Sequence, residues 1–221
     1  ESKNNVNRTS LRWIVKIEDQ TSLVSDNADT QYGIPEITSL SNHIDMNTMG
    51  NETVYLSGKN FGPASPLSSN MPYAEYVWYG TSSDEYRSYT LANCIVVVSH
   101  TRIQCTSKES KNNVNRTSLR WIVKIEDQTS LVSDNSDTQY GIPEITSLTN
   151  HIDMNTMGND TVYLSGKNFG PASALSSDSP YEEYVWYGTS SDEYRSYTLS
   201  NCIVVVSHTR IQCTSKESKN N

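Results

Sequence analysis

The sequence is a direct repeat of one long unit. Residues 109–216 repeat residues 1–108 with only eight substitutions, and residues 217–221 begin the unit again. All eight changes are between small or polar residues or remove a single apolar side chain: Ala28/Ser136, Ser41/Thr149, Glu52/Asp160, Pro66/Ala174, Asn70/Asp178, Met71/Ser179, Ala74/Glu182 and Ala92/Ser200. A unit longer than the roughly 20 to 50 residues of solenoid repeats indicates whole domains in series. Such an array supplies length or multivalency, so we expect no catalytic residues.

Composition favours an all-β chain without a nucleic-acid or membrane partner. The chain is polar, with 35% hydrophobic residues and a mean hydropathy of −0.60, and its apolar residues fall in short alternating runs between turn-forming residues. A net charge of −8 without any Lys/Arg cluster argues against phosphate binding. No stretch approaches the ~20 apolar residues of a membrane span. No signal peptide opens the chain, so we expect a secretion signal to lie upstream or to have been removed.

Each repeat carries one pair of cysteines, Cys94 with Cys105 and Cys202 with Cys213. Between the first two lie an apolar run at residues 95–98, a polar turn at 99–101 and a second strand-like run. A hairpin of this kind brings its two ends side by side, which suits a disulfide. A zinc site is less favoured because the pairs lack the C-x-x-C spacing. We therefore expect one disulfide in each repeat and no metal.

Four N-glycosylation sequons recur with the repeat, at Asn7, Asn51, Asn115 and Asn159. Each precedes a strand-like run, which predicts exposed turns. Sequons and paired cysteines together indicate an oxidising environment outside the cell, so we expect a secreted or cell-surface protein. N-linked glycans are expected, and no other cofactor is.

The pattern of one unit predicts six to eight short antiparallel strands. Runs at residues 36–40, 53–57, 75–80 and the cysteine hairpin are followed by a closing strand at 119–125. In this closing strand Leu119, Trp121, Val123 and Ile125 share one face, and Arg120, Ile122 and Lys124 share the other. This many short strands in about 105 residues predict two packed sheets.

The order of these motifs resembles the IPT/TIG family of immunoglobulin-like domains, found in plexins, growth-factor-type receptors and microbial surface proteins. The matching segments are Pro35-Glu36-Ile37-Thr38-Ser39, Gly58-Lys59-Asn60-Phe61-Gly62 and the Cys94–Cys105 hairpin, followed by the next Pro143-Glu144-Ile145. The resemblance covers the whole repeat, with departures in the loop at 63–72 and the Tyr-rich insert at 73–89. It implies an all-β fold of tandem immunoglobulin-like (IPT/TIG) sandwiches with a 108-residue repeat.

In this register the chain is out of phase with its domains. Residues 35–142 hold a complete sandwich, residues 143–221 hold a sandwich lacking its closing strand, and residues 1–34 hold a closing strand alone. An incomplete sandwich leaves backbone groups unpaired, so another copy must fill it. The filler is either the next repeat of a longer covalent chain or the N-terminal strand of a neighbouring subunit, with Leu11, Trp13, Val15 and Ile17 as the assembly strand. Both alternatives give a head-to-tail homopolymer, hence a filament.

We expect structural rather than catalytic or metal-binding roles for the histidines, the acidic loop residues and the aromatic cluster. The four histidines, His43, His100, His151 and His208, lie in polar turn-like context, and we expect them on the surface. The pair Asp84-Glu85 and the segment 26–29 could supply oxygen ligands to calcium, but neither matches a calcium-binding loop, so we expect solvated loops. For the Tyr/Trp cluster at residues 73–89 we expect core and intersubunit packing.

The sequence thus predicts a nonenzymatic structural glycoprotein whose tandem repeats form an extracellular filament or surface stalk. The alternative is an adhesin or receptor ectodomain that uses the Tyr-rich insert and the 63–72 loop to bind a protein or a glycan. A third class, a noncatalytic domain of a polysaccharide-degrading enzyme, would need a catalytic module that this sequence does not contain.

Overall fold

The fold was analysed in a computed structural model, which describes residues 10–26, 30–68, 75–91, 93–111, 114, 116–175, 183–190 and 193–217. The regular structure of these residues is almost entirely β, with one short 3-10 helix, η1 (Ser82–Asp84). The chain forms two compact units. Unit 1 comprises residues 1–43, 52–107 and 118–138, and unit 2 comprises residues 44–51, 108–117 and 139–221. Among the described residues no helix is long and apolar enough to cross a membrane.

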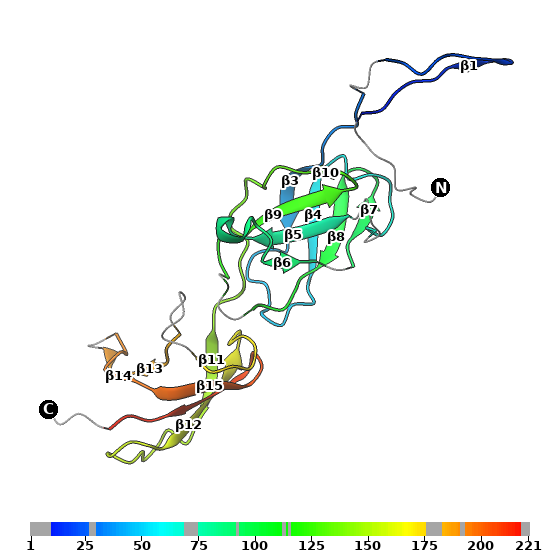
Figure 1. The fold of residues 1–221 in the computed structure, drawn as a ribbon. Coiled ribbons are helices and arrows are strands. Elements are labelled where there is room, and N and C mark those ends of the chain that lie inside the picture. The colour runs from blue at the N-terminus through cyan, green and yellow to red at the C-terminus, as the bar shows by residue number, and fades with distance from the viewer. Residues whose placement is uncertain are drawn as a thin grey trace. The chain divides into compact units, whose positions relative to one another are not determined.

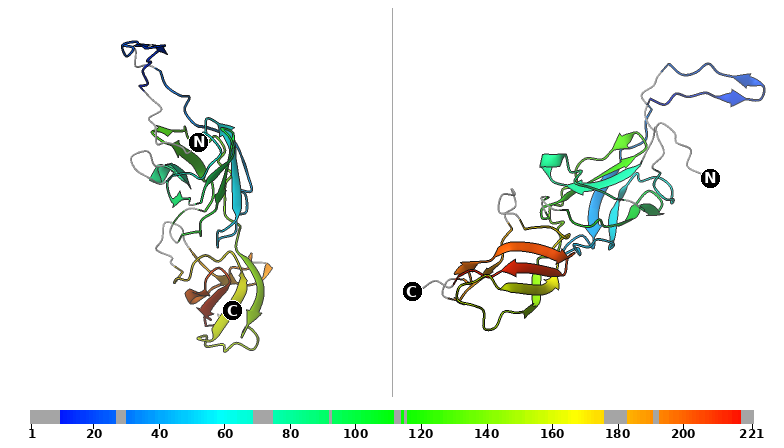
Figure 2. Two further views of the ribbon diagram at one scale, coloured as in Figure 1. Left: turned by 90° about the vertical axis from the view of Figure 1, so that its right-hand side faces the viewer. Right: turned by 60° about the horizontal axis from the view of Figure 1, so that its bottom comes forward.

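Unit 1 holds two four-stranded antiparallel sheets. One has the strand order β3 (Glu36–Ser41), β4 (Thr53–Lys59), β8 (Arg102–Thr106), β7 (Ile95–Val98). The other has the order β10 (Gln128–Thr129), β9 (Arg120–Ile125), β5 (Tyr76–Gly80), β6 (Tyr89–Thr90). Figures 1 and 2 show the two sheets as two layers lying over one another. The sequence prediction of an all-β chain is therefore confirmed.

The core of unit 1 lies between these layers. Alternate residues of β4 and β8, among them Val54, Leu56 and Ile103, are fully buried, as the period of a half-buried strand requires. From the other sheet, Tyr79 stacks on Trp121 with ring centroids 4.6 Å apart and on Tyr89 at 4.7 Å. For these aromatic side chains, the core packing expected from the sequence is what the structure contains.

Gly58 explains the end of β4 and the motif that follows it. A Cβ atom at this position would lie 1.9 Å from the carbonyl oxygen of Glu36, so only glycine fits. The pairing of β3 with β4 shifts register between Ile37 and Ser39, opposite this close approach. Asn60 then adopts a positive φ of 62°, and Phe61 turns into the core. The glycine motif thus forms a turn and a bulge.

Unit 2 repeats the first of these sheets but only part of the second. Its four-stranded sheet has the order β11 (Glu144–Thr149), β12 (Thr161–Lys167), β16 (Arg210–Thr214), β15 (Ser200–Val206). Its second sheet contains only β13 (Trp186–Tyr187) and β14 (Tyr197–Thr198). Within the described part of unit 2, no strand corresponds to β9 or β10.

The N-terminal copy of the closing segment forms a separate hairpin. It contains β1 (Lys16–Ile17) and β2 (Gln20–Thr21), which pair only with each other among the described strands. An isolated bridge between Leu11 and Thr30 closes its base. The residues that form β9 and β10 in unit 1 therefore recur, almost unchanged in sequence, as a two-stranded ribbon.

Candidate assembly interface

The closing segment of unit 1, residues 119–138, shows how this segment pairs and packs in a complete sheet. Strand β9 lies between β10 and β5, and its register with β5 pairs Val123 with Val77 and Trp121 with Tyr79. The side chains that the sequence placed on one face are fully buried: Leu119, Trp121, Val123 and Ile125. Ile122, on the other face, is only 7% exposed. This segment therefore supplies a large part of the apolar surface of the unit 1 core.

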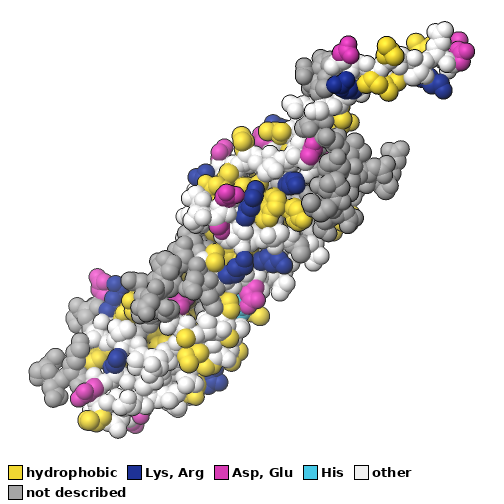
Figure 3. Space-filling model, viewed as in Figure 1, with side chains coloured by type: hydrophobic (Ala, Val, Ile, Leu, Met, Phe, Trp, Pro, Cys, Tyr) yellow, Lys and Arg dark blue, Asp and Glu magenta, His cyan; other side chains and the backbone are white. Residues whose placement is uncertain are grey.

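The same side chains are exposed in the N-terminal hairpin. Trp13 is 65% exposed, Val15 55% and Ile17 69%, whereas Leu11 is half-buried. Figure 3 shows hydrophobic side chains at the surface of this hairpin, interspersed with charged ones. Contiguous exposed apolar surface of this kind marks an interaction site. The residues predicted to form the assembly strand are thus accessible.

The hairpin nevertheless has the internal hydrogen bonds of the buried copy. Leu11, Ser22 and Ser25 donate their backbone N–H groups to Thr30, Val15 and Trp13 at 2.8–2.9 Å, and the equivalent bonds at residues 119–138 measure 2.8–3.0 Å. Side-chain bonds recur as well. The N–H groups of Trp13 and Val15 donate to the hydroxyls of Ser25 and Ser22 at 2.9 Å, as Trp121 and Val123 do to Ser133 and Ser130 at 3.0 Å. The exposed hairpin therefore has the same local conformation as the buried copy at residues 119–138.

Unit 2 has an apolar groove at the place where a closing segment would lie. Strand β13 pairs with β14 on one edge, and next to it lie two cavities of about 390 Å³ and about 220 Å³. Both are lined by Ile145, Leu164, Val185 and Trp186. Trp186 is 42% exposed and Ile145 54%. In unit 1 the corresponding face is covered by residues 119–138, where Val123 pairs with Val77, the equivalent of Val185.

A buried polar chain ties the closing segment to the rest of unit 1. The indole of Trp121 donates to the hydroxyl of Thr138 at 2.7 Å, and this hydroxyl lies 3.0 Å from Nδ1 of His43. His43 is 5% exposed and Thr138 is fully buried. Burial lowers the pKa of His43, and the carboxylate of Asp137, 3.6 Å away, offsets part of this effect. The neutral imidazole is the form that this site favours.

The expectation that all four histidines lie on the surface is wrong for two of them. His100 and His151 are exposed, but His43 and His208 are buried. In unit 2, Nδ1 of His208 lies 2.8 Å from the hydroxyl of Thr48, and Nε2 lies 2.9 Å from the carboxylate of Glu109. Each buried histidine has an exposed copy in nearly the same local sequence: His100 and His208 have identical neighbours, and His43 and His151 differ nearby only at Ser41/Thr149, so no sequence signal distinguished them.

Both expected disulfides are present. Cys94 bonds to Cys105 and Cys202 to Cys213, with Cα atoms 4.2 Å and 4.1 Å apart. Each bond joins the two strands of one hairpin, β7 with β8 and β15 with β16. The cysteines lie on the core side, at most 8% exposed, so each bond is packed inside its own unit.

Two of the four sequons can be located. Asn51 and Asn159 are exposed, and both have a positive φ, 65° and 68°, directly after a glycine. Each lies just before the first residue pair of a strand, β4 or β12, as the sequence predicted. Asn7 and Asn115 lie outside the described residues. The two located side chains are accessible to a glycosyltransferase.

The acidic residues considered for calcium have other partners. Asp84 accepts hydrogen bonds from the backbone N–H of Thr81 and from the hydroxyl of Ser88, so its carboxylate stabilises the turn at η1. Of the segment 26–29, only Asp26 lies within the described residues. Across the part of the chain that the structure describes, no group of three or more His, Cys, Asp or Glu residues is placed to hold a metal ion.

Comparison with known proteins gives no family for this chain. A scan against protein-family models matches none, and a search of curated proteins finds no relative.

Proposed function

We propose that this chain is a structural extracellular glycoprotein that extends head to tail into a filament or surface stalk. Its units are IPT/TIG-like sandwiches, and the closing segment of each is supplied by the copy that follows. The observation that carries the proposal is the contrast between two nearly identical segments: Trp121 and Val123 are fully buried in unit 1, whereas Trp13 and Val15 are mostly exposed.

The proposed contact places residues 11–30 of one copy on the groove of another. Shifting the observed β5–β9 register by the 108-residue repeat pairs Val15 with Val185, Trp13 with Tyr187 and Lys16 with Tyr184. The occupant of the groove is therefore specified by sequence: it is the segment that already fills the same groove in unit 1. Strand addition of this kind gives main-chain hydrogen bonds and alternate side-chain pockets.

Burial of the apolar face of the hairpin is the term that drives such a contact. Each apolar side chain that becomes fully buried contributes about 2 kcal/mol, and Leu11, Trp13, Val15 and Ile17 would all gain burial. Association opposes this with roughly 4 to 15 kcal/mol of lost translational and rotational freedom. Because the hairpin already has its internal hydrogen bonds, the cost of ordering it is small. A contact that does not close on itself then propagates as a filament.

The two disulfides and the exposed sequons at Asn51 and Asn159 support a location outside the cell. The chain is its own principal partner, and N-linked glycans decorate it.

A peptide that copies residues 8–34 tests the proposal. Added to the 221-residue chain, it should occupy the groove of unit 2 and shorten the assemblies, as measured by light scattering. The same peptide with Val15→Asp is the matched control and should have no effect. If neither peptide changes the size of assembled material, residues 11–30 are not the occupant of the groove.

A denaturing gel of native material separates the two ways of supplying the segment. After thiols are blocked and glycans removed, separate subunits give a band near the 24.8 kDa of this chain. A covalent array gives a species of much higher mass. In either case the groove is filled by the same sequence.

A further inference from the structure

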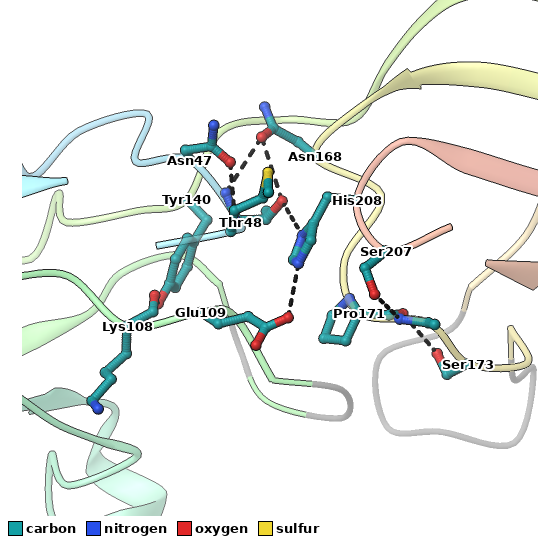
Figure 4. Close-up of polar contacts among 12 residues, drawn as sticks. Asn47, Thr48, Lys108, Glu109, Tyr140, Asn168, Pro171, Ser173, Ser207 and His208 are labelled. Atoms are coloured by element: carbon teal, nitrogen blue, oxygen red, sulfur yellow. Dashed lines mark hydrogen bonds and ion pairs between the residues drawn. The ribbon is translucent and has the colours of Figure 1, made fainter. Parts of the chain in front are cut away.

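A second set of contacts in unit 2 joins residues from the first sequence repeat to residues from the second. We call Thr48, Glu109, Asn168 and His208 the histidine latch. Figure 4 shows the ring of His208 between the hydroxyl of Thr48 and the carboxylate of Glu109, at 2.8 Å and 2.9 Å. The amide oxygen of Asn168 accepts the backbone N–H of Thr48 at 3.4 Å. Thr48 is fully buried and His208 is 3% exposed.

The chemistry of the latch is complementary at each atom. A carboxylate only accepts hydrogen bonds, so Nε2 of His208 is the donor toward Glu109. Nδ1 of His208 hydrogen-bonds with the Thr48 hydroxyl, which also lies 3.5 Å from the amide oxygen of Asn168. Hydrogen bonds to a charged group are about twice as strong as those between neutral groups. The latch therefore recognises a specific pair of side chains rather than a general polar surface.

Apolar and backbone contacts surround the latch. Met46 and Tyr140 are 1% and 2% exposed, and they form a parallel β-bridge. The phenol of Tyr140 donates to the carbonyl of Lys108 at 2.6 Å. Gly50 has a positive φ of 72°, and a Cβ atom there would lie 2.5 Å from the backbone N of Glu109. Together these contacts fit the backbone of residues 46–50 closely against that of residues 108–110.

Every member of this contact has a counterpart 108 residues away in the same chain. His100 and Asn60 correspond to His208 and Asn168, and Thr156 and Glu217 correspond to Thr48 and Glu109. Tyr32 and Met154 likewise correspond to Tyr140 and Met46. None of the eight substitutions between the repeats falls on these residues. The chemistry of the latch is thus preserved in both halves.

The counterparts remain accessible. His100 and Thr156 are exposed, and Tyr32 is 63% exposed where Tyr140 is 2%. Asn60 already holds the carbonyl of Ile34 at 2.8 Å, as Asn168 holds that of Ile142 at 3.1 Å, so this turn has the geometry of the latched copy. His100 and His208 also share a positive φ, 67° and 66°. The accepting turn is preformed.

From these observations we infer that His100 and Asn60 of one copy receive Thr156 and Glu217 of the preceding copy, forming the latch again between subunits. The partner is a second copy of this chain. The inference rests on the proposed head-to-tail assembly and adds to it: the closing strand fills the groove, and the latch is a second, polar contact beside it. Tyr32, which follows the donated hairpin, would then bond to the carbonyl of Lys216.

The sequon at Asn51 is compatible with this contact. Asn51 directly follows Gly50 and stays exposed in the latched copy, so a glycan there leaves the latch unobstructed. Asn159 is the equivalent of Asn51 in the second repeat and lies near Thr156. A glycan on Asn159 would likewise leave the proposed contact between subunits unobstructed.

The variant His100→Asn in the full-length chain tests the latch. Asn tolerates the positive φ at this position but is too short to reach both partners. We expect assembly, followed by sedimentation across concentration, to weaken roughly tenfold, the size of one lost charge-assisted hydrogen bond. Glu217→Gln should weaken assembly too, and the double variant should be little worse than either single one.

Lys59→Ala is the matched control. Lys59 lies near the same turn, and its counterpart Lys167 remains 61% exposed in the latched copy, so assembly should not change. If His100→Asn assembles as tightly as the wild type, the latch does not form between subunits, although strand donation stands. If the wild-type chain itself does not assemble, the proposed head-to-tail function fails, and the latch with it.

Discussion

The indole N–H of Trp13 donates to the hydroxyl of Thr30 at 2.8 Å, and its buried counterpart Trp121 makes the same bond to Thr138 at 2.7 Å. The two tryptophans differ only in what surrounds them: Trp13 is 65% exposed and Trp121 fully buried. Because the bond forms in both the exposed and the buried copy, the local conformation of this segment does not depend on its packing against a sheet. The N-terminal hairpin is therefore preorganised for the contact that we propose with the groove of unit 2, which would reduce the cost of binding.

A charge on the buried face of the hairpin should abolish assembly. Val15→Asp places a carboxylate opposite Val185, in a groove whose lining is mostly apolar, and assembly should be lost to the limit of detection in a sedimentation experiment. The hairpin alone should keep its fold, since Val15 is 55% exposed there.

Leu23→Asp is the control for this change. Leu23 is 92% exposed, and its counterpart Leu131 remains 79% exposed in the completed unit 1, so this residue should stay in solvent after docking. Equal loss of assembly in both variants would indicate a general charge effect and would contradict a face-specific contact.

Removal of one disulfide should destabilise the unit that contains it. Cys94→Ser with Cys105→Ser opens a loop whose ends are 11 residues apart, which corresponds to about 3 kcal/mol of unfolding free energy. Urea unfolding under non-reducing conditions measures this loss. Excess reductant opens both disulfides of the wild-type protein and should destabilise it at least as much, and an unchanged midpoint in the variant would contradict a stabilising role.

The stability of unit 1 should depend on pH through His43. Its pKa in the folded state is lowered below 6.5 by burial, so the unfolded chain binds a proton more readily than the folded one. The stabilising contribution is full above the unfolded pKa and is lost as the pH falls below 6.5 towards the folded pKa. Between about pH 7.5 and about pH 5.5 the wild type should lose more stability than His43→Gln. Parallel pH profiles of the two proteins would rule out this contribution.

Glycan occupancy can be tested without changing the Asn residues, which have a positive φ. Thr53→Val and Thr161→Val remove the sequons of Asn51 and Asn159 and keep a β-branched residue in the strand. Each variant, expressed in a glycosylating host, should lose the mass of one glycan in intact-mass spectrometry. A mass unchanged apart from the substitution would mean that the site is unoccupied.

The sequence predicted regular structure well where a pattern repeats along a strand. Alternation in residues 119–125 identified the buried face of β9, and the spacing of Cys94 and Cys105 identified the disulfide hairpin. The sequence could not predict which histidines are buried, because His100 and His208 have identical neighbours and differ only in their tertiary environment. Trp13 and Trp121 likewise have similar neighbours in sequence but differ in burial. In a repeated sequence, local pattern cannot say which copy is packed.

Sedimentation of the intact 221-residue chain over a range of concentrations tests the central claim most directly. Completion of unit 2 by residues 11–30 of another copy predicts growth by mass action in steps of one chain, 24.8 kDa before glycans, together with a blue shift of tryptophan fluorescence as Trp13 becomes buried. A single species of 24.8 kDa at every concentration, with no change in fluorescence, would contradict head-to-tail completion.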